Sequence, residues 1–169
     1  MKKLSPKEKI LSLFLVIILL AEFLYIGSII SPKFKNALAN LGAILPSILI
    51  LKTNEERSNQ NLSELVENET LNQAAQLKAE NMAKNSYFSH KDKEGNSPWY
   101  YLDLVGYDYA VAGENLAVNF KESLEVHNAW MKSPTHMANI IQPRFTEIGI
   151  GTAEGIYKGK EVTFVVQFF

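Results

Sequence analysis

Residues 147–169 read "EIGIGTAEGIYKGKEVTFVVQFF". The two ends of this stretch, 147–155 and 160–169, are rich in β-branched and aromatic residues, which favour β-strands. The segment between them, "IYKG", is short enough to turn the chain back on itself. We therefore expect an antiparallel hairpin at this end of the sequence.

The sequence before the hairpin is mostly helical in pattern. In residues 71–82, Leu71, Ala75 and Met82 recur at helical spacing, and Asn68 is placed to accept hydrogen bonds from the free amides of the first turn. Ser97 and Pro98 suit the start of a shorter helix. Further helices are expected over 47–60, 98–106 and 121–133, with another turn or two over 135–141. Because helices come first and strands last, we expect an α+β domain with helices packed on an antiparallel sheet.

Residues 10–30 are apolar with one charge, Glu22, and four lysines precede them. A helix of that length spans roughly 30 Å, the thickness of the hydrocarbon core of a bilayer. We predict a single-pass signal-anchor helix at 10–30, a basic cytoplasmic tail at 1–9, a linker at 31–46 and a domain outside the cytoplasm at 47–169. One alternative is secretion after cleavage of a signal peptide, with "ALA" at 37–39 as the cleavage site.

Charge and cysteine content exclude several classes of function. The chain has 169 residues and a net charge of -1, but residues 1–51 hold six lysines and two glutamates, whereas 52–169 hold eleven Lys and Arg and sixteen Asp and Glu. An acidic domain lacks the basic face that phosphate binding needs, so we expect no nucleic-acid partner. The absence of cysteine excludes thiol catalysis, a thiolate zinc site and disulfides.

Seven short motifs occur in order along the chain and together resemble the bacterial branch of the CAP superfamily, which comprises cysteine-rich secretory, antigen 5 and pathogenesis-related proteins. They are "NEER" (54–57), "AAQLKAENMA" (74–83), "YFSH" (87–90), "AGENLAV" (112–118), "AWMKSPTHMANII" (129–141), "FTEIGIG" (145–151) and "FVVQFF" (164–169). The resemblance covers about 47–169 and implies an α-β-α sandwich with a central antiparallel sheet.

The resemblance also implies a cleft lined by two histidines and two acidic groups. His90 and His136 match the two histidines, and Glu114 matches the glutamate of "GEN". The second acidic position is Ser133 here, and we consider Glu147 as a compensating carboxylate. The third histidine, His127, has no counterpart in the motifs, so we expect it on a helix surface.

Two imidazoles and a carboxylate can hold a divalent cation, with Zn2+ as the default candidate. The predicted metal ligands are His90, Glu114 and His136. The alternative is that the same groups form a hydrogen-bonded network without any ligand.

Three functions remain open. The first is a membrane-anchored binding module of the cell envelope for a lipid, glycan or protein, and the second is a hydrolase with a histidine as general base, Glu114 orienting it, and water, Ser89 or Ser133 as nucleophile. The third is a structural protein with a vestigial cleft.

Five aromatic residues precede Glu114 and could line a binding surface or pack in the core: Trp99, Tyr100, Tyr101, Tyr107 and Tyr109.

Overall fold

The structure, a computed structural model, describes residues 44–169. The predicted tail at 1–9 and anchor at 10–30, and nearly all of the linker at 31–46, lie outside the described residues. Within the described range, no helix is both long enough and apolar enough to cross a membrane.

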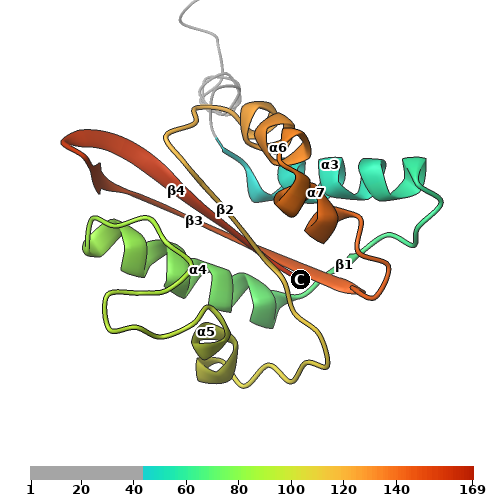
Figure 1. The fold of residues 1–169 in the computed structure, drawn as a ribbon, viewed down its shortest axis with the longest axis horizontal. Helices are drawn as coiled ribbons and strands as arrows, with labels where there is room; N and C mark the ends of the chain where they lie inside the picture. The colour runs from blue at the N-terminus through green and yellow to red at the C-terminus, as the bar shows by residue number, and fades with distance from the viewer. Residues whose placement is uncertain (1–43) are drawn as a thin grey trace, which may run out of the picture. The chain divides into compact units, whose positions relative to one another are not determined.

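A four-stranded sheet forms the centre of the domain (Figure 1). Its order is β1 (Val66–Glu67), β3 (Glu147–Tyr157), β4 (Lys160–Phe168) and β2 (Glu114–Val118). The hairpin predicted from the sequence is β3 and β4, and its two-residue turn places Lys158 and Gly159 at positive φ, 50° and 76°, as the right-handed twist of a hairpin favours.

The sheet is mixed, whereas the sequence led us to expect an antiparallel one. The two residues of β1 pair in parallel with the start of β3, where Val66 lies opposite Glu147. A two-residue strand has no periodicity that a sequence pattern could reveal.

Helices cover both faces of the sheet, giving the expected α-β-α layers (Figure 1). On one face lie α3 (Pro46–Asn59), α6 (Ser123–Lys132) and α7 (Pro134–Ile140); on the other lie α4 (Glu69–Lys84) and α5 (Trp99–Leu104). Asn68 caps α4 as predicted, with Oδ1 accepting from the amide of Thr70 at 2.8 Å. Ser97 does not cap α5: the N-cap residue is Pro98, and no side chain caps that helix.

Helix α4 packs directly against β3 because two glycines remove the side chains between them. A Cβ on Gly149 or Gly151 would lie 2.2 Å from backbone atoms of α4. The helix also supplies hydrogen-bond partners for the strand: Asn72 Oδ1 accepts from Ile150 N at 2.9 Å, and Gln76 Oε1 accepts from Thr152 N at 3.1 Å. Side chains of α4 therefore occupy the edge of β3 that the short β1 leaves open.

Candidate functional site

Strand β2 directs Glu114 into the layer between the sheet and α4. Side chains alternate along a strand, so Glu114 and Leu116 share one face, and Leu116 belongs to the same core as the buried residues of α4. The side chain of Glu114 is 2% exposed. A carboxylate at that depth needs polar partners.

His90 provides the main partner. Its Nδ1 is hydrogen-bonded to Glu114 Oε2, while its imidazole is 58% exposed. The hydrogen bond with Glu114 raises the pKa of His90 above its usual value, and burial raises the pKa of Glu114. The site therefore presents an exposed imidazole that a buried carboxyl group orients and whose cationic form it favours.

Lys78, from α4, lies fully buried beneath this pair. Its Nζ donates to the main-chain oxygen of His90 at 2.8 Å and to Tyr87 Oη at 3.4 Å. The ammonium also lies 5.4 Å from the ring centroid of Tyr87 and 5.1 Å from that of Tyr101. Burial lowers the pKa of Lys78, whereas Glu114 and Asp92 oppose that shift.

Asp92 completes this charged group and anchors the loop that carries His90. Its carboxylate accepts from Asn96 N at 2.7 Å, from Asn96 Nδ2 at 2.9 Å and from Tyr101 Oη at 3.2 Å. Burial would raise its pKa, but these hydrogen bonds and the charge of Lys78 together lower it. The loop is thus fixed at both Asp92 and the His90 carbonyl.

Within the described part of the chain, Glu114 Oε1 is a buried oxygen without a hydrogen-bond partner.

His136 lies near the pair and does not hydrogen-bond to it in the described residues. Burial lowers its pKa, and the charge of His90 lowers it further, which places the two rings within electrostatic range. Its main-chain oxygen accepts from Asn115 Nδ2 at 3.2 Å. Asn115 in turn accepts from Asn139 Nδ2 at 2.9 Å, so α7 is tied to β2 beside Glu114.

The metal set predicted from the sequence does not fit this arrangement. Nowhere in residues 44–169 do three histidine, aspartate or glutamate side chains group as ligands for one ion. Glu114 is hydrogen-bonded to His90, and His136 lies near the pair without a hydrogen bond to it in the described residues. A structural zinc site takes four ligands and a catalytic one three, so metal binding remains a prediction that this geometry does not support.

An apolar pocket of about 250 Å³ adjoins His136. Ser133 and His136 are its polar lining residues, and the remaining lining residues are Phe88, Leu116, Ala117, Val118, Phe120, Ala129 and Trp130. Ser133 stands at the position where the family resemblance implies a second acidic residue. The pocket accordingly has no acidic lining residue.

Glu147 and His127 both lie away from the His90–Glu114 pair. Glu147 accepts hydrogen bonds from Tyr107 Oη at 2.5 Å and Asn68 Nδ2 at 3.0 Å, and both lower its pKa. It joins β3 to the start of α4 and takes no part in the histidine pair. His127 is 3% exposed, which corrects its expected place on a helix surface. It packs between α6 and α3, with Nε2 3.5 Å from Glu56 Oε1.

Sequence reasoning missed Lys78 as part of the site. The signal was present, because a lysine occurs among the apolar positions of α4, on the face that turns toward the sheet. The five aromatic residues differ in their surroundings: Tyr101 is buried, Trp99 is partly buried against the same core, Tyr107 donates a hydrogen bond to Glu147, and Tyr100 and Tyr109 are about 40% exposed.

A comparison with protein families gives a match over residues 51–169 to the model described as CAP, the cysteine-rich secretory protein family. The chain belongs to this family. The CAP domain therefore accounts for the sheet, its helices and the His90–Glu114 pair, since all of these lie within or beside the matched range.

Individual relatives agree. YkwD of Bacillus subtilis is 41% identical over 102 residues, which are 60% of this chain and 40% of YkwD. The membrane protein YlbC of the same organism is 26% identical over 138 residues, 80% of this chain and 40% of YlbC. The chain thus spans less than half the length of either relative.

Solved structures share the fold. An extracellular protein with an SCP domain from Bacillus anthracis superposes with a TM-score of 0.63 at 26% identity, over 73% of this chain and 39% of that one. An outer surface protein from Borrelia burgdorferi gives a TM-score of 0.61 at 27% identity, over 72% of this chain and 89% of that one.

Proposed function

We propose that this CAP domain is a binding module outside the cytoplasm, anchored to the membrane by residues 10–30, and that it takes an amphiphilic ligand. The polar group of the ligand contacts the imidazoles of His90 and His136, and its apolar group enters the pocket beside His136. Relatives described as an extracellular protein, an outer surface protein and a membrane protein support that location.

One observation carries the proposal: a buried carboxyl group fixes the exposed imidazole of His90 near His136, which lines an apolar pocket. Ligand sites combine apolar walls with a few oriented polar groups in this way. His136 connects the two parts, because it lines the pocket and its pKa responds to the charge of His90. A raised pKa on His90 favours its cationic form, which suits an acidic or hydrogen-bond-accepting ligand group.

A hydrolase is the alternative function, and the hydrogen bonds favour binding over it. A serine nucleophile needs a base within hydrogen-bond reach. Among the described side chains, none of the hydrogen bonds joins a serine hydroxyl to His90 or His136, and Ser133 Oγ instead lies 3.2 Å from Thr135 Oγ1.

Titration with decanoate and decanol tests the proposal. The full chain in detergent micelles, labelled with 15N and 13C, should show saturable NMR shifts at Ala129 and His136 with both probes. Glu114→Gln should weaken decanoate binding about tenfold and leave decanol unchanged, because the glutamine no longer stabilises the charged imidazole. Glu64→Gln, at an exposed site, serves as the control. Absence of saturable shifts at Ala129 with either probe would rule out a ligand pocket here.

A further inference from the structure

Strand β2 is shorter than its antiparallel neighbour β4 and leaves the first residues of β4 without a described partner strand on that side. β4 begins at Lys160, but its pairing with β2 stops where Val118 lies opposite Phe164. The next residue of the β2 chain, Asn119, has a φ of 66°, a left-handed conformation that turns the backbone away from the sheet. Among the described residues, β4 therefore has no strand beside residues 161–163 on its β2 side.

Hydrogen-bond alternation shows which backbone groups face this open edge. Gly113 and Phe169 exchange both bonds, N to O, at 3.2 and 3.0 Å, so the odd-numbered residues of β4 bond toward β2. The continuation of that pattern directs the N–H and C=O of Glu161 and Thr163 to the open edge. Four backbone groups without a described partner lie there, which is the template for adding a strand.

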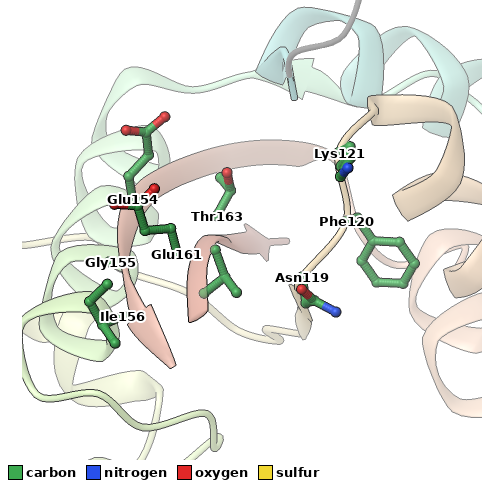
Figure 2. Close-up of a pocket in the computed structure, with 9 residues that line it drawn as sticks. Asn119, Phe120, Lys121, Glu154, Gly155, Ile156, Glu161 and Thr163 are labelled. Atoms are coloured by element: carbon green, nitrogen blue, oxygen red, sulfur yellow. The ribbon is translucent and has the colours of Figure 1, made fainter. Parts of the chain in front are cut away.

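A pocket of about 550 Å³ lies along this edge. Figure 2 shows it between the segment that carries Asn119, Phe120 and Lys121 and the hairpin that carries Glu154, Ile156, Glu161 and Thr163. The pocket thus occupies the place where β2 would lie if it continued. Phe120 also lines the apolar pocket beside His136, and the two pockets share no other lining residue.

Two glutamates and one lysine, Lys121, line the pocket, so acidic side chains are in excess there, and Ile156 adds an apolar one. In the hairpin, Thr163 pairs with Glu154 and Glu161 pairs with Ile156, so all four side chains lie on one face. Both glutamates are exposed, and neither belongs to an ion pair in the described part of the chain. Ile156 is 49% exposed.

We infer that this edge binds an extended peptide segment that carries a basic side chain. The peptide adds as a short strand to Glu161 and Thr163, and its lysine or arginine reaches Glu154 and Glu161. An apolar side chain two residues along the peptide, on the same face as the basic one, covers Ile156. Charge complementarity selects this partner, because the region from 52 to 169 holds sixteen acidic residues against eleven basic ones. Main-chain bonds supply affinity in such strand addition, and side chains supply specificity.

The probe for this site is the peptide acetyl-Val-Thr-Lys-Thr-Val-amide, which puts its lysine and both valines on one face, added to the 15N-labelled full chain in detergent micelles. We expect saturable amide shifts and at least tenfold slower hydrogen exchange at Glu161 and Thr163. Two further peptides carry N-methyl groups on alternate backbone amides, one on each set. Strand addition predicts that one set abolishes binding, because only one set of amides faces β4.

Charge reversal tests the selectivity. Glu154→Lys combined with Glu161→Lys should abolish binding of the lysine peptide and create binding of acetyl-Val-Thr-Glu-Thr-Val-amide. The control, Glu64→Lys with Glu94→Lys, makes the same change in net charge at exposed sites away from the pocket. Absent shifts at 161–163, shifts that both methylated peptides retain, or equal losses in the reversal and control variants would each overturn the inference.

Discussion

Lys78 Nζ donates to the main-chain oxygen of His90 across 2.8 Å, from the interior of the domain to the loop at its surface. The same ammonium interacts electrostatically with Glu114 and Asp92, since the charges of both carboxylates oppose the lowering of its pKa by burial. One residue of α4 therefore sets both the position of the His90 loop and the charge balance around Glu114.

Lys78→Met should destabilise the domain and disturb the histidine pair together. Removing one partner of a buried charge group leaves the others uncompensated, and we expect a loss of about 3 kcal/mol in the free energy of unfolding, measured by urea titration. The pKa of Glu114, followed by 13C NMR of its carboxyl carbon, should rise further. Lys84→Met, an exposed site on the same helix, is the control and should change neither quantity. An unchanged Glu114 pKa in Lys78→Met would assign Lys78 a packing role only.

Glu114→Gln should lower the pKa of His90. The hydrogen bond with Glu114 is the main cause that raises this pKa, and burial alone would lower it. NMR titration of the His90 ring protons should therefore show a midpoint above 6.5 in the parent and below it in the variant. Equal midpoints would mean that the hydrogen bond does not persist in solution.

The raised pKa of His90 should make the domain less stable as pH rises into the alkaline range. A raised pKa means that the folded state binds the proton of His90 more tightly than the unfolded state does. The stabilisation is complete below about 6.5 and is lost as pH rises through the folded pKa. Thermal unfolding from pH 6 to 9 should show a decline in the parent that His90→Asn removes.

The sequence predicted the helices and the hairpin well because their patterns are local. Helix α4 has its cap at Asn68 and its apolar face in one continuous run, and β3 and β4 are joined by a two-residue turn. The structure joins His90 to Glu114 by a hydrogen bond, and the sequence singled out both residues only through motifs that resemble those of a family, with a metal site and a hydrogen-bonded network as alternatives. Spacing alone could not have shown that two residues 24 positions apart would touch.

The remaining features depend on tertiary packing. His127 lies three residues before Trp130, on the face of α6 that is buried, so its spacing carried a signal that the expected surface position overlooked; its partner Glu56 comes from α3. Glu147 lies in the strand that precedes the glycines, and its partners Asn68 and Tyr107 come from 79 and 40 positions away. Local sequence patterns around Glu147, Asn68 and Tyr107 do not indicate that these residues contact one another.

His127 should make the domain sensitive to acid. Burial lowers the pKa of His127, and its Nδ1 is a buried atom without a hydrogen-bond partner in the described part of the chain. A lowered pKa means that the folded state resists protonation, so the stabilisation present above about 6.5 is lost as pH falls through the folded pKa. His127→Leu should reduce the drop in melting temperature between pH 7 and pH 5. A drop equal to that of the parent would place the acid sensitivity in other groups.

Arg57→Lys should destabilise the domain and loosen α7. Arg57 is 1% exposed, and its guanidinium donates to four carbonyl oxygens, of Ser63 at 2.8 Å, Ile140 at 3.0 Å, Gln142 at 2.8 Å and Phe145 at 3.1 Å. A lysine ammonium cannot match this planar fork, so buried carbonyls lose their donors. We expect a loss of about 3 kcal/mol, from two or three unsatisfied groups at about 1–3 kcal/mol each with partial relaxation.

The position of these carbonyls makes the effect specific to the site. Ile140 ends the helix that begins at Pro134 and carries His136, so amide exchange in α7 should accelerate in Arg57→Lys more than in α4. The exposed Arg144→Lys is the matched control and should leave both helices unchanged. Uniform acceleration across α4 and α7 would show instead that Arg57 supports the domain as a whole and does not hold the end of α7 in particular.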